Sequence, residues 1–285
     1  MTTDVEHDFD VKPLAQGFAA LVSGLDLARV PGSADEARVR DLHRRYPVLA
    51  FADQRLDPPE FVAFSRLFGP LEIDTHLTQF TDPEIPELIT LANYDAAGKP
   101  DPASAGRGSA WHTDSTYKAD PCAHTVLYAL EVPSAGGGTL FADMARAYDS
   151  LPANVQAEIE GRRALHLFGA GPASGGVIPL TEEQKGLLPS VEQPVVRTHP
   201  ESGRKSLYVN PLHTVEIVGM ARAESDALLD RLFAHALRPE LIYHHHWQVG
   251  QVVIWDQRCT MHKAEAQYAM HERRRLLRTK IAAAA

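Results

Sequence analysis

The chain has 285 residues, of which 44% are hydrophobic and 23% are charged, so its composition is that of an ordinary globular protein. A net charge of −9 gives no sign of a surface for nucleic acid or for an anionic membrane. Two cysteines are too few for a disulfide framework, and neither a signal peptide nor an apolar run of membrane-spanning length is visible, so we expect a cytoplasmic protein with reduced thiols.

The predicted elements follow a polar, acidic segment over residues 1–10, which we expect to be a flexible tail; residues 11–285 are expected to form a single domain. Apolar residues at helical spacing predict helices over residues 35–46, 58–68, 144–151, 152–161 and 224–237. Strand-like runs occupy residues 48–51, 88–91, 126–132, 139–142, 206–209, 241–247, 251–256 and 273–281. This order predicts a mainly β fold with flanking helices, a double-stranded β-helix (jelly roll).

Two stretches without periodicity, residues 93–109 and 169–193, are rich in small residues, glycine and proline. We expect both to be loop insertions in the domain. The first lies directly before the segment with the clearest chemical signal, a position typical of an active-site lid.

That segment is Trp111-His112-Thr113-Asp114. On a strand, His112 and Asp114 would project from the same face, because side chains alternate with period two. His262, from a distant strand, would complete a set of two histidines and one carboxylate. Such a set leaves metal positions open and is typical of non-haem Fe(II) oxygenases. A zinc hydrolase is an alternative for any three-ligand site with an open position.

Two arginines follow His262 in the last predicted strand. Arg274 can offer a planar fork to a carboxylate, and Arg278, four residues later, shares its face of the strand. A buried arginine needs an anionic partner. A hydrolase that uses metal-bound water does not need a fixed guanidinium nearby, whereas an enzyme that chelates a dicarboxylic 2-oxo acid does, so the arginines favour the oxygenase.

With these residues, the chain resembles the taurine dioxygenase and 2,4-dichlorophenoxyacetate dioxygenase family of Fe(II)/2-oxoglutarate enzymes. The resemblance extends from about Leu14 to Ile281. It rests on WHTDSTY at 111–117, VPSAGGGTLFADM at 132–144, PVVRTHPESGRKSLYVN at 194–210, WQVGQVVIWDQRCTMH at 247–262 and RRRLLRTKI at 273–281.

The resemblance implies that His112, Asp114 and His262 hold Fe(II). It also implies that Thr139 and Arg274 bind the distal carboxylate of 2-oxoglutarate, which is converted with O2 to succinate and CO2. Arg278, His213 and, more weakly, Tyr117 and the 72–77 segment (Glu72, Asp74 and His76) would contact the primary substrate. That substrate would be a small anionic organic molecule: a carboxylate, a phenoxyalkanoate-like acid, a sulfonate or an alkyl sulfate. Because halogenating relatives lack the carboxylate ligand, Asp114 implies hydroxylation.

Two positions depart from the family pattern. Gln257 stands where the family usually has Asn, outside the ligand set, so we expect it to alter packing rather than chemistry. Asp74 stands where taurine enzymes carry His, and an aspartate there would repel a sulfonate, which argues against taurine. Three adjacent histidines, His244 to His246, are expected in a strand rather than at a metal, because neighbouring side chains face opposite ways.

The expected partners are few. We expect a homo-oligomer that binds a small molecule and neither nucleic acid nor membrane. A non-catalytic jelly-roll binding protein stays an alternative to both enzyme classes, and the intact ligand set argues against it.

Overall fold

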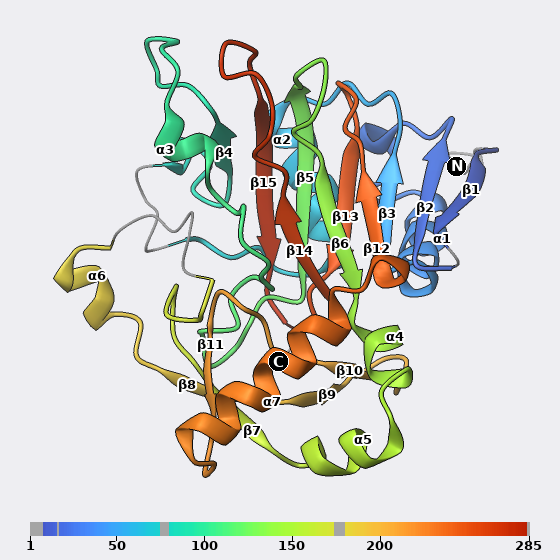
Figure 1. The fold of residues 1–285 in the computed structure, drawn as a ribbon. Coiled ribbons are helices and arrows are strands. Elements are labelled where there is room, and N and C mark those ends of the chain that lie inside the picture. Colours follow the sequence, from blue (N-terminus) through green and yellow to red (C-terminus); the bar gives the residue numbers. More distant parts are fainter. Residues whose placement is uncertain (1–7, 16, 75–79, 174–179, 284–285) are drawn as a thin grey trace.

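Two β-sheets face each other at the centre of the molecule, with the strands of the smaller sheet crossing in front of the larger one (Figure 1). The structure, a computed structural model, describes residues 8–15, 17–74, 80–173 and 180–283. Most of the predicted tail over residues 1–10 lies outside the described residues, and so does His76.

The larger sheet has the strand order β1-β2-β3-β13-β5-β15-β4. Its strands are β1 (Asp10–Ala15), β2 (Ala19–Ser23), β3 (Val48–Phe51), β4 (Ile89–Ala92), β5 (His124–Glu131), β13 (Val252–Asp256) and β15 (Arg275–Ile281). Neighbours pair antiparallel, except that β2 and β3 run parallel. Every residue of the central β13 is buried, as its continuous apolar sequence predicts for a strand covered on both faces.

The smaller sheet has the order β12-β6-β14 and is antiparallel throughout. It consists of β12 (Ile242–His245), β6 (Thr139–Asp143) and β14 (Thr260–Ala264). Two further small sheets lie in the lower half of Figure 1, with the orders β11-β7-β8 and β10-β9. Their strands are β7 (Arg163–His166), β8 (Val191–Pro194), β9 (Val196–Thr198), β10 (Lys205–Leu207) and β11 (Thr214–Ile217).

The helices are α1 (Asp35–Arg45), α2 (Pro58–Ser65), α3 (Pro102–Ala105), α4 (Met144–Asp149), α5 (Ala153–Ile159), α6 (Glu182–Gly186) and α7 (Arg222–Ala236). Short 3-10 turns occupy Leu27–Arg29, Arg66–Phe68 and Pro239–Leu241. α2 begins at a capping box between Asp57 and Glu60, which satisfies backbone N–H groups at the helix start. α1 ends at the residues before Pro47, which disfavours helical backbone in the preceding residue. None of the helices in the described part of the chain combines the length and apolar character needed to span a bilayer.

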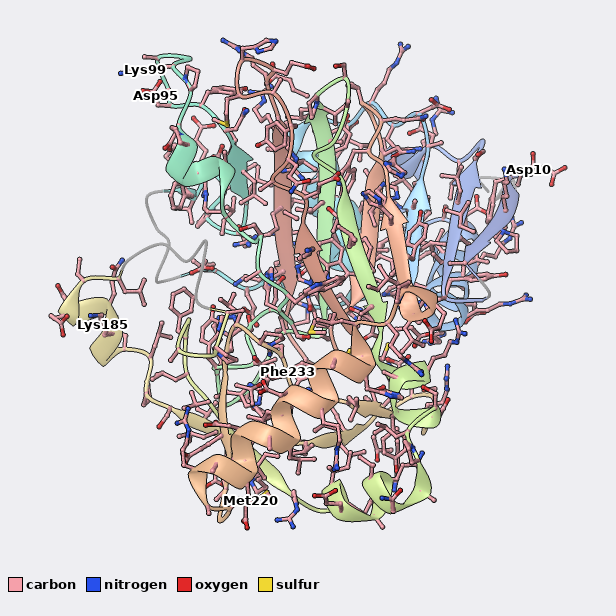
Figure 2. The ribbon with its side chains drawn as sticks, viewed as in Figure 1. Asp10, Asp95, Lys99, Lys185, Met220 and Phe233 are labelled. Atoms are coloured by element: carbon pink, nitrogen blue, oxygen red, sulfur yellow. The ribbon has the colours of Figure 1, made fainter. Side chains whose placement is uncertain are left out.

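Three clusters of buried apolar side chains hold these layers together. One lies between the two sheets and includes Phe141, Trp255 and Leu276. A second packs α1 and α2 on the outer face of the larger sheet. The third joins α4, α5 and α7 to the ends of β6 and β14, with Phe233 of α7 buried in it, whereas Asp95, Lys99 and Lys185 lie at the periphery (Figure 2). The first and third clusters meet at β6, which contributes Phe141 to the first and Ala142 to the third. The site described next lies beside this strand and its neighbour β14.

The fold is the predicted double-stranded β-helix with flanking helices, but some elements differ from expectation. The Trp111–Asp114 segment is not a strand: it makes a single bridge and then turns. The predicted loop over residues 93–109 contains the short helix α3, and the one over 169–193 contains α6. Strands β1 and β2, at one end of the larger sheet, were not predicted.

Candidate active site

The two predicted histidine ligands lie opposite each other on neighbouring backbone segments. His112 forms an antiparallel bridge with His262 of β14, and the backbone N–H of each donates to the carbonyl of the other, at 2.9 and 2.7 Å. Directly opposite residues of an antiparallel pair project to the same side, and the two ring centroids lie 4.3 Å apart. Phe141 and Trp255 pack against the His262 ring, so the core between the sheets fixes its orientation.

Asp114 reaches the same point from a turn. The next residue, Ser115, has φ of 60°, a left-handed conformation that is uncommon outside glycine, and the chain reverses there. One carboxylate oxygen, Oδ1 of Asp114, lies 3.5 Å from Nε2 of His112. The two side chains therefore meet as predicted, but the prediction that they share the face of a strand is wrong.

The three side chains fit a divalent metal ion. Their ligand atoms all lie within 4.8 Å of one another. Nδ1 of His112 lies 2.8 Å from the carbonyl oxygen of Ala110, an arrangement in which Nδ1 carries the proton and the Nε2 lone pair faces Asp114. Two atoms with lone pairs facing each other need a cation between them.

Burial and neighbouring charges favour the metal-binding protonation states. Burial lowers the pKa of His262 to about 3, so its imidazole is neutral. Burial alone would raise the pKa of Asp114, but the contact with His112, the neighbouring His262 and the positive charge of Arg278 hold it well below its usual range. Neutral imidazole and ionised carboxylate are the forms that bind Fe(II).

Gln257 holds the carboxylate of Asp114. Its Nε2 donates to Oδ2 of Asp114 at 2.8 Å and to Oγ1 of Thr125 at 2.9 Å, and its Oε1 accepts from the backbone N–H of Asp114 at 3.1 Å. The Thr125 hydroxyl donates to the same Oδ2 at 2.7 Å. Gln257 therefore contacts a predicted ligand directly, contrary to the expectation that it would alter only packing.

Thr139 and Arg274 lie at one end of the same cavity. The indole N–H of Trp247 donates to the Thr139 hydroxyl at 3.0 Å, which leaves the hydroxyl proton of Thr139 to donate elsewhere. Nε of Arg274 donates to the carbonyl of Gly137 at 2.9 Å, and Asn93 fixes the Arg274 backbone. Burial lowers the pKa of Arg274. No carboxylate in the described part of the chain forms an ion pair with its guanidinium. A buried, anchored guanidinium without a carboxylate partner is suited to a ligand carboxylate.

Arg278 lies in a charged group that the sequence did not predict in full. Oδ2 of Asp74 lies 2.9 Å from Nζ of Lys280 and 3.7 Å from the Arg278 guanidinium. Lys280 is two residues after Arg278, on the same face of β15, so the period of the strand could have identified it. From the sequence, we expected Asp74 to be a carboxylate that would repel an anion. In the structure it is paired with two cations.

His213 and Tyr117 pack side by side in the wall of the cavity. Their ring centroids lie 4.8 Å apart, and Phe168 stacks on His213 at 5.7 Å. Burial and the nearby His112 hold the pKa of His213 well below its usual value. Nδ1 of His213 accepts from the backbone N–H of Gly169 at 3.0 Å, so Nε2 carries the proton of the neutral ring.

One cavity collects eight of the residues predicted for the site: His112, Asp114, Tyr117, Thr139, His213, His262, Arg274 and Arg278. Of the weaker candidates, Asp74 also lines it, whereas Glu72 does not and pairs with Lys118 at 2.9 Å. Arg107, which precedes the His112 segment, also lines it and was not predicted. The three adjacent histidines do not line it. His244 and His245 end β12 and His246 follows the strand, with His245 buried and His246 exposed.

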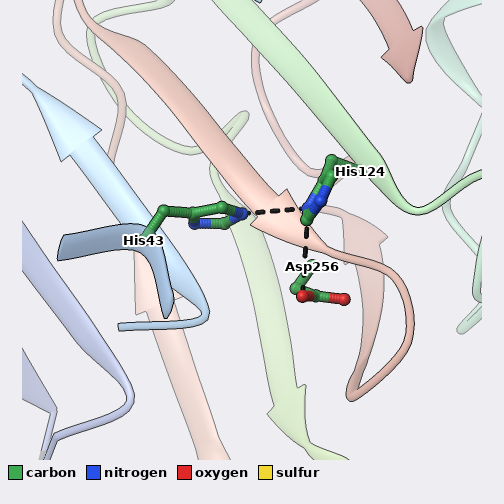
Figure 3. Close-up of side chains that lie close together, drawn as sticks. All are labelled: His43, His124 and Asp256. Carbon is green, nitrogen blue, oxygen red and sulfur yellow. Dashed lines mark hydrogen bonds and ion pairs between the residues drawn. The ribbon is translucent and has the colours of Figure 1, made fainter. Parts of the chain in front are cut away.

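A second cluster of histidine and aspartate side chains lies outside this cavity (Figure 3). Nε2 of His43 lies 3.0 Å from Nδ1 of His124, which lies 3.9 Å from Oδ2 of Asp256. Metal ligands are often of these types, but Arg258 donates to both oxygens of Asp256, at 2.9 and 2.6 Å, and His199 lies 3.0 Å from Oδ2. The cluster is a buried hydrogen-bonded network that joins α1, β5 and β13, and no motif in the sequence indicated it.

A double-stranded β-helix with two histidines and a carboxylate facing a cavity defines the class of non-haem iron oxygenases. The family model for taurine catabolism dioxygenases, the TauD/TfdA family, matches residues 10–280. The chain belongs to the TauD/TfdA family and is an alpha-ketoglutarate-dependent dioxygenase, in a family that uses Fe(II). Membership excludes the two alternatives, a zinc hydrolase and a non-catalytic binding protein.

Individual relatives match over nearly their whole length. An alpha-ketoglutarate-dependent 2,4-dichlorophenoxyacetate dioxygenase from Cupriavidus pinatubonensis is 35% identical, over 93% of this chain and 95% of its own. An (S)-phenoxypropionate/alpha-ketoglutarate-dioxygenase from Sphingobium herbicidovorans is 37% identical, over 90% and 89%. The crystal structure of AAD-2 in complex with Mn(II) and N-oxalylglycine superposes with a TM-score of 0.84 at 33% identity, over 98% of both chains.

Proposed function

We propose that this dioxygenase hydroxylates a small anionic organic molecule, with His112, Asp114 and His262 as the iron ligands and Thr139 and Arg274 as the residues that bind 2-oxoglutarate. The observation that carries the proposal is the convergence of these residues in one cavity. When bound, Fe(II) and 2-oxoglutarate supply the activation of O2 and the oxidising power, with succinate and CO2 as products.

The protein's own part is to bind, orient and exclude water. Arg274 and the Thr139 hydroxyl would hold the distal carboxylate of 2-oxoglutarate, since both donate into one end of the cavity. His213, Tyr117 and Phe168 would form the wall against which the primary substrate packs, because their rings contact one another beside His112. A fixed pose next to the metal selects which C–H bond reacts.

The charges of the cavity support an anionic substrate. Its described lining includes four cations, Arg107, Arg274, Arg278 and Lys280, against two carboxylates, Asp74 and Asp114. A ferrous ion and the dianion of 2-oxoglutarate cancel each other, so they leave this excess of positive charge unchanged. The primary substrate is then the group that balances it.

Phenoxyalkanoic acids are the substrate class that the relatives suggest. The two relatives described above act, by name, on 2,4-dichlorophenoxyacetate and (S)-phenoxypropionate. Hydroxylation of a carbon that carries an ether oxygen gives a hemiacetal, which collapses and breaks the ether bond. Alkyl sulfates and sulfonates are the other anionic substrates to include in a screen.

Succinate formation from 2-oxoglutarate, with Fe(II) and a panel of such anions, tests the function. At least one anion should stimulate turnover, and His112→Ala, Asp114→Ala and His262→Ala should each reduce it below detection while circular dichroism shows a folded protein. Full Fe(II)-dependent activity in any one of the three variants would refute that ligand. Stimulation only by uncharged compounds would refute the anionic substrate class.

A further inference from the structure

The cavity contains a third guanidinium, that of Arg107, to which the proposed function gives no individual role. Arg107 follows α3 and is half-buried, and its guanidinium carbon lies 3.9 Å from the ring centroid of Phe80. Its nitrogens make two long contacts, each of 3.4 Å, with the backbone carbonyls of Ser104 and Ala92. No carboxylate of the described ranges lies within ion-pair distance of it, in contrast to Arg278 and Lys280, which both contact Asp74.

Arg107 and Arg278 act on each other as like charges. Burial first, and then the positive charge of Arg278, lower the pKa of Arg107 to about 10, and the negative charge of Asp101 only partly offsets this. Nε of Arg278 is buried and has no hydrogen-bond partner among the described residues. Two neighbouring cations with unused N–H groups at one cavity wall are stabilised by an anion that both can contact.

The backbone holds Arg107 close to the reacting centre. The carbonyl of the next residue, Gly108, accepts from the backbone N–H of Ala264 in β14 at 2.7 Å. Ala264 is two residues after His262, so the Arg107 segment is fixed to the strand that carries a predicted iron ligand. Movement of this segment would shift Arg107 relative to the iron site as well as to Arg278.

We propose that Arg107 is a second anion-binding residue, which together with Arg278 clamps the carboxylate or sulfonate group of the primary substrate. This inference rests on the proposed function and adds a determinant of substrate specificity to it. Lys280 has a different part, since its contact with Asp74 at 2.9 Å keeps that carboxylate from neutralising Arg278 fully.

The test compares a charged probe with a neutral one of nearly the same shape. Isothermal titration calorimetry is carried out without O2 on protein loaded with Fe(II) and 2-oxoglutarate. The probes are 2,4-dichlorophenoxyacetate, hexanesulfonate and the neutral 2,4-dichlorophenoxyethanol. Loss of one charged hydrogen-bonding partner predicts that Arg107→Gln binds the dichlorophenoxyacetate or the sulfonate about 10- to 100-fold more weakly, with the neutral alcohol changed less than about twofold.

Arg273→Gln is the matched control. Arg273 also stacks on an aromatic ring, with its guanidinium carbon 4.6 Å from the Tyr94 centroid, but it lines a separate surface hollow. Its replacement should leave binding of all three probes unchanged. Which of the two acids is more affected by Arg107→Gln distinguishes a carboxylate from a sulfonate subsite.

Two results would overturn the inference alone. Arg107→Gln could bind the acids as tightly as wild type does, or its affinity for acid and alcohol could fall equally, which is what a purely structural role of the Phe80 stack predicts. In both cases Arg278→Gln would still reduce the affinity for the acids, and the proposed function would stand. If wild-type protein binds the alcohol as tightly as both acids, the anionic substrate class itself fails, and the inference fails with it.

Discussion

At the scale of single residues, the position of Gln257 shows what a family comparison in sequence alone leaves out. The replacement of Asn by Gln is visible in the sequence, but its effect depends on the register of the turn after β13. There the longer side chain reaches Oδ2 of Asp114 at 2.8 Å. Because that distance joins residues far apart in the chain, spacing could not predict it.

Gln257→Leu should weaken metal binding, because Asp114 would lose a donor that fixes its orientation. Outer-shell partners of this kind typically contribute about 10- to 100-fold in metal affinity. Mn(II) titration followed by electron paramagnetic resonance measures this without turnover. Gln257→Asn, the usual family residue, should retain more affinity than Gln257→Leu. Equal Mn(II) affinity in wild type and Gln257→Leu would show that Thr125 alone positions the carboxylate.

Arg274, directly before β15, and Arg278, within it, should have separable effects. A lysine keeps the charge but loses the planar fork, so Arg274→Lys should raise the KM for 2-oxoglutarate by an amount equivalent to about 1.5–3 kcal/mol. Arg278→Lys should instead raise the KM for the primary substrate. Steady-state kinetics with each ligand varied in turn distinguishes them. A larger effect of Arg278→Lys on 2-oxoglutarate would show that the assignment of the two residues is reversed.

At the scale of elements, the helices and the central strands could be predicted because local patterns determine them. The capping box at Asp57 and the apolar run of β13 are complete within a few residues. The Trp111–Asp114 segment could not be predicted, because its only ladder contact is the bridge to His262 and its turn depends on Ser115. Strands β1 and β2, at one end of the larger sheet, are defined by their pairing and carry weak patterns of their own.

The network between α1, β5 and β13 should make stability depend on pH. Burial lowers the pKa of His43 to about 3 and that of His124 to about 4, from 6.5. Between pH 6.5 and these pKa values, the unfolded chain binds protons that the folded chain does not. The free energy of unfolding is therefore highest above pH 6.5 and decreases as the pH falls. Each group contributes a slope of about 1.4 kcal/mol per pH unit.

Urea unfolding of metal-free protein at pH 7.5, 6.5 and 5.5 measures this loss. His43→Gln should make the dependence shallower, whereas replacement of the exposed His246 by Gln should leave it as in wild type. An unfolding free energy that rises from pH 6.5 to 5.5 would contradict the expected sign.

At the scale of the whole molecule, the candidate site joins the two facing sheets. His262 and Thr139 come from the smaller sheet, Arg278 comes from the larger one, and Arg274 directly precedes strand β15. Metal and 2-oxoglutarate should therefore link the two sheets and stabilise the fold. The homo-oligomer expected from the sequence stays a prediction.

Adding Mn(II) and 2-oxoglutarate together should raise the unfolding temperature by several degrees. A ligand at 100 times its Kd contributes about 2.7 kcal/mol to the free energy of unfolding. Differential scanning fluorimetry with and without a chelator measures the shift. Asp114→Ala should abolish the shift, and an equal shift in that variant would place the metal elsewhere, with the His43–His124–Asp256 cluster as the first site to examine.

The origin of each side chain in the cavity has a consequence for how this enzyme can evolve. Among the residues assigned to iron and 2-oxoglutarate, His262 and Thr139 lie in strands, and His112 is bridged to His262 through its backbone. Arg107, Asp74 and Phe168 come from loops, where insertions and replacements disturb little else. Natural selection can therefore exchange one substrate for another by remodelling loops while the oxidative chemistry is inherited unchanged. Protein engineers can follow the same route by grafting the 93–109 segment of one relative onto the strands of another.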